Sequence, residues 1–199
     1  MRMMKAVLLA ATLLVCASGA SSAGTMTFGL GGGVTKPIGD FADFAKLGFN
    51  GGVYGDYWLK DNYAFGVDIT GNFLKGKSDF VDALTSTTYP DPSVKATLIS
   101  FGAHGKWAPP MEDASVSPWI TYGVALYNIS TKIEDAGPSK NFDNSESKFG
   151  FNGGGGLDFK GNDSMKPGVD AKYHYIMTDN KATSYITAGV HVTFSTTGK

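Results

Sequence analysis

Hydrophobic and polar residues alternate along this chain in eight separate segments, each about ten residues long. The most regular segment covers residues 185–194, where the even positions are all apolar: Ile186, Ala188, Val190, Val192 and Phe194. Alternation with a period of two is typical of a β-strand that has one apolar face. A regular strand near the end of the chain can pair with the first strand and close the sheet into a barrel without edges.

The other seven segments define the connections between the strands. They span residues 26–34, 49–59, 63–73, 99–107, 118–126, 149–160 and 169–175. The longest connections are 35–47, 75–93 and 130–147, which we expect to be exposed loops, and shorter turns such as 60–62 and 161–166 alternate with them. This asymmetry is typical of a membrane barrel with long outer loops and short periplasmic turns. We therefore predict an all-β fold, an eight-stranded antiparallel up-and-down transmembrane β-barrel.

The glycines indicate which face of each strand points inward. The chain has 27 glycines, against roughly 14 expected from average use of about 7%. Many stand on the polar face, among them Gly29, Gly31, Gly66 and Gly102. The interior of an eight-stranded barrel is just wide enough for its side chains, so small residues belong there. The apolar face then points outward to lipid, and the aromatic residues near the short turns would form an interfacial girdle: Tyr57, Tyr63, Trp107 and Phe159.

The first residues of the chain predict export from the cytoplasm. Basic residues precede an apolar run, and small residues follow it up to Ala23, so residues 1–23 are expected to be a cleaved signal peptide. Residues 24–199 would then be one mature barrel domain without cysteine, because Cys16 is the only cysteine. Removing Arg2 and Lys5 changes the formal net charge from −1 to −3, which gives no indication of nucleic-acid binding.

Charged residues and histidines on the inner face are the candidates for chemistry. The set comprises Asp56, Asp68, His104, Lys106, Asp158, Lys160, Asp170, Lys172, His174 and His191. Most lie toward the periplasmic ends of their strands, so we expect a salt-bridged plug in which buried polar groups satisfy one another. With a turn centred near Met165, Lys160 would face Asp170 and Asp158 would face Lys172, because opposite charges pair across strands.

The final strand carries the most specific resemblance to a known family. Its residues Thr187-x-Gly189-x-x-Val192-x-Phe194 look like the signal that outer-membrane barrels present to the barrel-assembly machinery, although residues 195–199 extend beyond Phe194. The Pro37-x-Gly39-Asp40-Phe41 stretch is similar to the family's opening. The whole mature chain resembles the small outer-membrane β-barrel proteins of the OmpX, OmpA-barrel and opacity-protein type. The resemblance implies location in the outer membrane among its lipid and lipopolysaccharide, with periplasmic chaperones and the assembly machinery as partners in biogenesis.

Three functional classes follow from this interpretation. The first is a monomeric, non-enzymatic barrel with a filled lumen, whose loops give it a structural or surface-recognition role in adhesion or envelope integrity. The second is a narrow porin-like channel for ions or small solutes, although eight strands normally leave no continuous pore. The third is a periplasmic lipocalin-like barrel that binds lipid. We expect no cofactor and no metal, since His174 and His191 would stand several residues apart at about 3.3 Å each. The loop sequences select no particular surface ligand.

Overall fold

The computed structural model of the protein describes residues 24–60, 62–84, 92–111, 114–135, 142–162, 164–178 and 182–196. The predicted signal peptide, residues 1–23, lies outside the described residues, as do the central parts of two predicted loops, 85–91 and 136–141.

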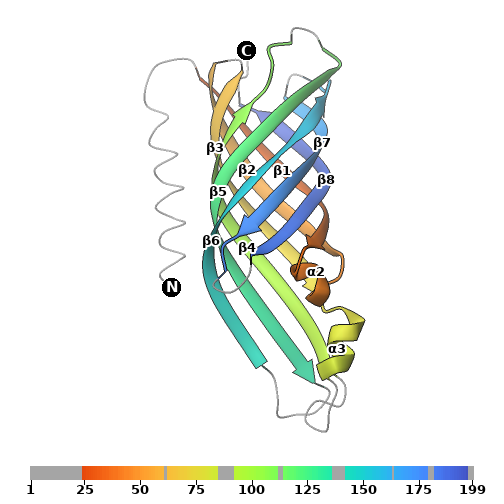
Figure 1. Cartoon of the computed structure of the whole chain (residues 1–199). Coiled ribbons are helices and arrows are strands. Elements are labelled where there is room, and N and C mark those ends of the chain that lie inside the picture. Colours follow the sequence, from red (N-terminus) through yellow and green to blue (C-terminus); the bar gives the residue numbers. More distant parts are fainter. Residues whose placement is uncertain are drawn as a thin grey trace.

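The described residues form eight antiparallel strands in one closed barrel (Figure 1). The strands are β1 (Thr25–Ile38), β2 (Gly48–Lys60), β3 (Tyr63–Lys75), β4 (Pro92–Trp107), β5 (Val116–Asp135), β6 (Phe142–Phe159), β7 (Met165–Ile176) and β8 (Thr183–Ser195). Each strand pairs with its neighbours in sequence, and β8 pairs with β1 from Thr27↔Ser195 to Ile38↔Ser184. The predicted eight-stranded fold and the closure of the last strand onto the first are confirmed.

Two short helices lie at the same end of the barrel, the lower end in Figure 1. Helix α2 (Phe41–Phe44) follows β1, and helix α3 (Ser78–Leu84) follows β3. Phe41, Phe44 and Ala45 are spaced for one helical turn in the sequence, and α2 has this position. Helix α3 has no counterpart among the sequence-based expectations. The opposite end, where β1 begins and β8 ends, carries the short turns.

Strands β4, β5 and β6 are much longer than the alternation of apolar residues indicates, and β1 continues through residues 35–38, which were predicted to be loop. Strands β5 and β6 stay paired to Ile133↔Phe142, and β4 pairs with β5 to Pro92↔Asp135. The prediction of a loop over 130–147 is therefore wrong for residues 130–135 and 142–147, which are strand. Beyond Leu126 the outward residues of β5 become polar, so the apolar signal ends while the backbone pairing continues. We call residues 92–97, 128–135 and 142–147 the projection.

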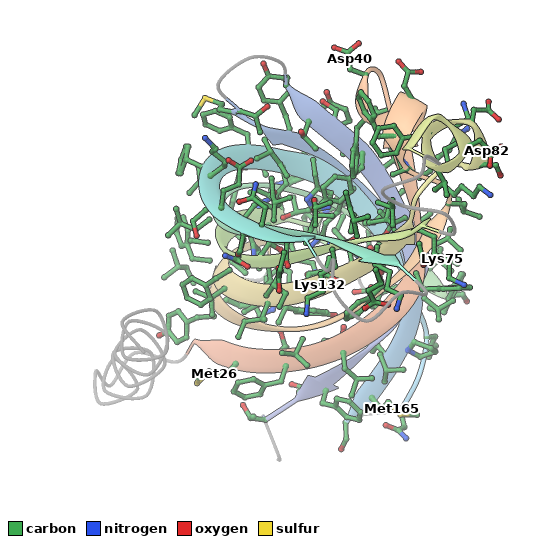
Figure 2. All side chains as sticks on the ribbon, turned by 90° about the horizontal axis from the view of Figure 1, so that it is seen from below. Met26, Asp40, Lys75, Asp82, Lys132 and Met165 are labelled. Carbon is green, nitrogen blue, oxygen red and sulfur yellow. The ribbon has the colours of Figure 1, made fainter. Side chains whose placement is uncertain are left out.

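The apolar face of the strands points outward, as predicted. Phe49 is 72% exposed, Val190 65% and Tyr122 64%, whereas the polar Thr35 and Asn72 on the inner face are completely buried. A soluble barrel would have the reverse arrangement, so the lipocalin-like alternative is wrong. Side chains fill the interior of the ring of strands, as the view along the barrel shows (Figure 2). Among the described residues, no helix is long and apolar enough to span a bilayer.

Candidate functional site

Two histidines in the lumen each lie between two aspartates. The imidazole of His104 on β4 has Nε2 at 2.8 Å from Asp56 Oδ1 and Nδ1 at 2.9 Å from Asp68 Oδ1. The imidazole of His191 on β8 repeats this arrangement, with Nε2 at 2.8 Å from Asp158 Oδ1 and Nδ1 at 2.9 Å from Asp170 Oδ1. Both groups therefore use two carboxylates and both ring nitrogens.

A glycine at the centre of each group makes this geometry possible. Gly66 on β3 pairs with Asp56 on one side and with His104 on the other. Gly168 on β7 pairs in the same way with Asp158 and with His191. A Cβ at Gly66 would lie 2.6 Å from His104 Nε2, and a Cβ at Gly168 would lie 2.6 Å from His191 Cε1. The missing side chain lets aspartate and histidine meet across the intervening strand.

The hydrogen bonds determine the charge of the two histidines. An ionised carboxylate only accepts hydrogen bonds, so a ring that bonds two carboxylates through both nitrogens must donate from both. If all four aspartates are ionised, His104 and His191 are both imidazolium groups. In that state the two histidines, Lys106 and Lys172 carry four positive charges against the four carboxylates of the two groups. Buried carboxylates are stable only when paired and hydrogen-bonded, which this arrangement provides.

Lys106 and Trp119 connect the two groups across the lumen. The Lys106 Nζ atom lies 3.6 Å from Asp56 Oδ2 and 4.3 Å from the centroid of the Trp119 ring. Trp119 Nε1 donates a hydrogen bond of 2.8 Å to Asp158 Oδ1. Asp56 Oδ2 has no hydrogen-bond partner among the described residues, so the ammonium group of Lys106 is its compensation. We call the two groups, with Lys106, Trp119 and Lys172, the polar layer.

The third histidine has a different environment. His174 Nδ1 lies 3.1 Å from the Tyr127 hydroxyl, and Nε2 lies 3.3 Å from Thr187 Oγ1. Its ring stacks on Tyr185 with 4.5 Å between centroids and 8° between planes. Hydroxyl groups both donate and accept, so a neutral imidazole satisfies these bonds. His174 is thus a buried packing residue beside the polar layer.

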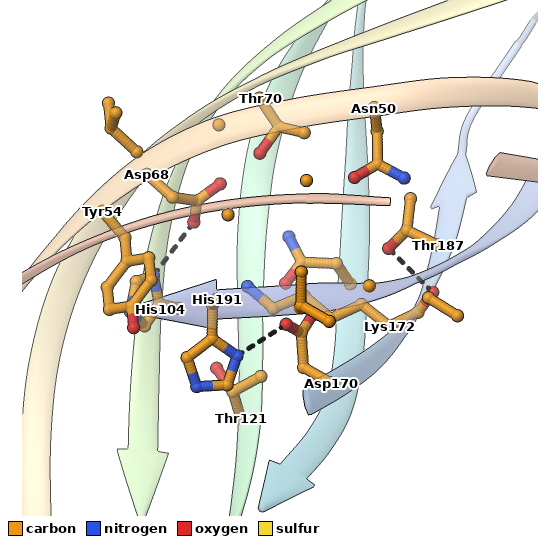
Figure 3. A pocket seen from close by; sticks show the side chains of 18 of the residues that line it. Asn50, Tyr54, Asp68, Thr70, His104, Thr121, Asp170, Lys172, Thr187 and His191 are labelled. Atoms are coloured by element: carbon orange, nitrogen blue, oxygen red, sulfur yellow. Dashed lines mark hydrogen bonds and ion pairs between the residues drawn. The ribbon is translucent and has the colours of Figure 1, made fainter. Parts of the chain in front are cut away.

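Apolar side chains close the lumen on the side of the helices. The buried set comprises Ala45, Leu74, Leu98, Ala125, Tyr127, Ile176 and Tyr185, which we call the apolar layer. A cavity of about 80 Å³ lies within the polar layer, lined by residues that include His104, His191, Lys172, Asn50 and Thr70 (Figure 3). That volume accommodates a few water molecules. The described lumen is thus an ion-paired layer that encloses a small polar cavity, followed toward the helices by an apolar layer.

Two expectations about the inner charges are wrong. Lys160 lies after the end of β6 and is exposed, so it does not join the buried residues. The expected pairs Lys160–Asp170 and Asp158–Lys172 do not form, because Asp158 pairs with Gly168, and Lys172 with Gly154. A β-bridge joins Asn162 and Met165, so the chain reverses closer to the end of β6 than expected, and this changes the register. The charge of Asp158 is matched by a histidine two strands away.

Sequence reasoning missed Trp119, Tyr54 and the glycine-centred repeat. The Tyr54 hydroxyl bonds Thr193 Oγ1 at 2.5 Å and closes the polar layer on one side. A signal was present in the sequence: Gly66-Val67-Asp68 and Gly168-Val169-Asp170 are identical tripeptides, and each starts ten residues after an aspartate. No group of His, Cys, Asp or Glu in the described ranges is arranged to hold a metal ion.

The residues of the expected assembly signal occupy both faces of β8. Thr187 and Gly189 point inward, with Thr187 6% exposed and Gly189 against the backbone of Gly32. Phe194 points outward and is 41% exposed. Strand β8 continues to Ser195, so Phe194 is the second-to-last residue of the strand.

The comparisons with known proteins give one family and many similar structures. The model of the family described as outer membrane protein beta-barrel domain matches residues 7–194. A search of curated proteins found no match.

Three solved structures illustrate the similarity, and at these identities the likeness shows the fold alone. Neisserial surface protein A has 16% identity and a TM-score of 0.61, over 87% of this chain and 99% of that chain. A major outer membrane protein from Thermus thermophilus has 13% identity and a TM-score of 0.60, over 87% and 100%. The attachment invasion locus protein Ail of Yersinia pestis has 14% identity and a TM-score of 0.56, over 87% and 99%.

Proposed function

The chain belongs to the outer membrane protein β-barrel domain family, and from this premise we propose that it is a non-catalytic surface-recognition protein with a closed lumen. As an outer-membrane barrel it is surrounded by membrane lipid. In this proposal the barrel is a rigid anchor, and the projection is the part that meets the surroundings of the cell.

The observation that carries the proposal is the projection itself. Strands β4, β5 and β6 extend beyond the outward apolar residues at the end that carries the long connections (Figure 1). In small membrane barrels the long connections lie outside the cell and the short turns in the periplasm. Regular strand pairing costs backbone entropy, so a paired sheet beyond the membrane indicates a surface of defined shape.

Cross-strand polar contacts hold the outer face of the projection. Asn128 Nδ2 donates to Ser145 Oγ at 3.1 Å and to Ser147 Oγ at 3.3 Å. Lys132 Nζ lies 3.4 Å from Asp143 Oδ2, and Lys95 Nζ lies 2.5 Å from Glu134 Oε2. These contacts keep the sheet ordered without an apolar face toward lipid.

One edge of the projection is suited to recognition. Strand β6 pairs with β7 only from Gly150 onward, while it pairs with β5 up to Phe142. The stretch 143–147 is exposed at every residue and forms an edge strand on that side. An edge strand offers backbone donors and acceptors to an extended partner segment, which adds to the sheet as another strand. Charged Asp143 and Glu146 restrict nonspecific pairing there.

The filled lumen supports recognition over conduction. An ion entering from the helix side meets Tyr127, Tyr185 and Leu98, which are completely buried. Moving a charge past an apolar layer costs several kcal/mol, on the order of the desolvation penalty of a buried ion. A channel of this size would need a continuous polar path, so the channel alternative has less support.

A fold neighbour has a sulfated carbohydrate analogue bound. Ail of Yersinia pestis was solved in complex with the heparin analogue sucrose octasulfate. That complex makes heparin a suitable probe for this chain. Heparin tests carbohydrate recognition, and gelatin offers extended polypeptide to the β6 edge.

The test is a shortened hairpin. Residues 130–145 are replaced by Asn-Gly, which joins the paired residues Ile129 and Glu146 through a two-residue turn. Cells with the full protein should adhere to immobilised heparin or gelatin, and cells with the shortened protein should not. The heat-dependent shift on a denaturing gel controls for an intact barrel. Equal adhesion of both variants, or discrete conductance of the purified full protein, would contradict the proposal.

A further inference from the structure

The polar layer concentrates charges of both signs in a small part of the lumen. Its carboxylates come from β2, β3, β6 and β7, and its cations come from β4, β7 and β8. The carboxylates are Asp56, Asp68, Asp158 and Asp170, and the cations are Lys106, Lys172 and the protonated His104 and His191. With every carboxylate ionised, four negative charges face four positive ones. The stability of the layer therefore depends on the ionisation of its aspartates.

The two aspartate pairs differ in their access to water. The side chains of the pair bonded to His104 are 0% and 11% exposed, and those of the pair bonded to His191 are 16% and 22% exposed. Toward the short turns the inner face of the strands continues with polar residues, among them Thr27, Ser117 and Lys166. Protons thus have a polar route to the layer from this end of the barrel that does not cross the apolar layer.

Lys106 is held in the layer by one carboxylate and three aromatic rings. Its Nζ atom lies 3.6 Å from Asp56 Oδ2 and 4.3 Å from the centroid of the Trp119 ring. The centroids of Tyr54 and Trp58 lie at 5.6 Å and 5.7 Å. Attraction to an aromatic face is weaker than attraction to a buried carboxylate. Lys106 is also the second-to-last residue of β4, so its flexible side chain starts close to the end that carries the short turns.

Lys172 acts on the layer through its charge alone. Its ammonium group forms no hydrogen bond and no ion pair within the part of the chain that the structure describes, although its side chain lines the cavity of the layer (Figure 3). A positive charge in this position attracts the ionised aspartates around the cavity. Once the aspartates are neutral, the same charge only repels the other cations.

We propose that the polar layer is an acid-sensitive lock on the half of the lumen that faces the short turns. An aspartate becomes neutral as the pH falls through its pKa, whereas lysine and histidine are cationic in acid. Protonation of the four aspartates leaves four positive charges without compensation in a medium of low dielectric constant. Lys106 then moves away from the three rings toward the short turns, and water enters the layer.

The apolar layer stays closed in this transition, so the lock opens no pore. The aspartates supply stability at neutral pH, where they are ionised, and this stability is lost as the pH falls. The inference rests on the geometry of the lumen and is independent of the recognition role of the projection.

His174 is the other group beside the cavity that can change its charge in acid. The phenol groups packed against the layer, those of Tyr54 on β2, Tyr127 on β5 and Tyr185 on β8, are neutral at both neutral and acid pH. Protonation of His174 would add a positive charge of its own. His174→Gln separates this contribution from that of the aspartates, because an amide can bond both neighbouring hydroxyl groups.

Acrylamide quenching of Trp119 fluorescence in lipid nanodiscs tests the proposal. The protein carries W58F/W107F, which leaves Trp119 as the only one of the three tryptophans and keeps an aromatic ring at position 58. Trp119 is 7% exposed. The rate constant of quenching should rise severalfold and reversibly when the pH is lowered from 7 to about 3, below the ordinary aspartate pKa of about 3.9. The heat-dependent gel shift at each pH controls for an intact barrel.

Lys172→Met separates charge repulsion from a general effect of acid. It removes one positive charge and no direct contact, so the rise in quenching at acid pH should be smaller than in the protein that keeps Lys172. The matched control is Lys166→Met on the same strand, whose exposed side chain is screened by solvent. This control should show the full rise, and so should His174→Gln.

Four results would overturn the lock. The first is an unchanged quenching constant between neutral and acid pH in an intact barrel, and the second is a full rise in Lys172→Met. The third is loss of the gel shift at the pH of the rise, which would mean that acid unfolds the whole barrel. The fourth is a rise that disappears in His174→Gln, which would assign the response to His174 in place of the aspartates.

Discussion

His104 and His191 occupy equivalent positions on strands that are four apart in a ring of eight. Each bonds an aspartate on the adjacent strand and another one strand further, across a glycine of the strand between. The aspartates of each group, 56 with 68 and 158 with 170, have the same spacing in the sequence. The barrel thus holds a carboxylate pair twice in the same way, once buried and once half-buried, and the two groups meet through Lys106 and Trp119.

The central glycines should be intolerant of a methyl group. Gly66→Ala and Gly168→Ala each place a Cβ where the histidine and backbone already lie, so the bonds to the histidine must lengthen or break. We expect a loss of about 3 kcal/mol of unfolding free energy, typical of breaking a buried ion pair. The measurement is urea unfolding in lipid vesicles, followed by the gel shift.

Gly51→Ala is the matched control for that experiment. The Cβ of an alanine at Gly51 would have its nearest neighbour, Gly31 O, at 3.7 Å, and the position faces outward. Its effect should stay within about 0.5 kcal/mol. If Gly51→Ala and Gly66→Ala lowered the unfolding free energy by comparable amounts, the loss at Gly66 would not come from the histidine group.

Removing one histidine should cost more than removing the whole group. His104→Ala leaves Asp56 and Asp68 buried without their shared donor, so we expect about 3–5 kcal/mol of destabilisation. The triple variant H104A/D56N/D68N buries neutral amides in place of the carboxylates and should recover part of that loss. Additive losses, with the triple variant the least stable, would contradict the ion-paired description.

The three histidines should differ in protonation at neutral pH. His104 and His191 each face two carboxylates, so both nitrogens of each ring should carry hydrogen. His174 contacts two hydroxyl groups, so only one of its ring nitrogens should carry hydrogen. Nitrogen-15 chemical shifts of the imidazoles in nanodiscs distinguish the two states directly. A neutral His104 would mean that Asp56 or Asp68 holds the proton instead.

The apolar layer should be what prevents conduction. Replacing Tyr127 and Tyr185 together by alanine removes two of the largest buried side chains of that layer. We expect no discrete steps from the wild type in planar bilayers and small steps from Y127A/Y185A. Tyr122→Ala is the control, since Tyr122 lies on the same strand but faces lipid. Steps from the wild type would favour the channel alternative.

The barrel could be predicted from the sequence because the alternation that identifies each strand is a local pattern of neighbouring residues. Alternation along 185–194 directly sets which face of β8 meets lipid, and glycine on the other face reflects the crowded lumen. Beyond Leu126 the outward residues of β5 are polar, while inward residues such as Ile129 and Ile133 stay apolar. The outward apolar face that identified the strand therefore ends before the strand pairing does. That is why most of the projection, residues 130–135 and 142–147, was expected to be a loop.

These sequence patterns could not predict which charged residues pair in the lumen. Asp158 and Lys172 have opposite charges on adjacent strands, but the short turn at 160–164 shifts their register. The cationic side chain that Asp158 contacts is His191, which is two strands away and reachable only because Gly168 has no side chain. Such a contact depends on three strands at once, and only the repeated Gly-Val-Asp tripeptide hinted at it.

The most direct test of a surface-exposed projection on an outer-membrane barrel is labelling of single cysteines on intact cells. Ser145→Cys places a thiol on the edge of the projection, and Lys160→Cys places one beside the turn between β6 and β7. A membrane-impermeant maleimide should label the cysteine at 145 on intact cells, and the one at 160 only after the outer membrane is permeabilised. Labelling of position 160 on intact cells, with position 145 protected, would contradict the account.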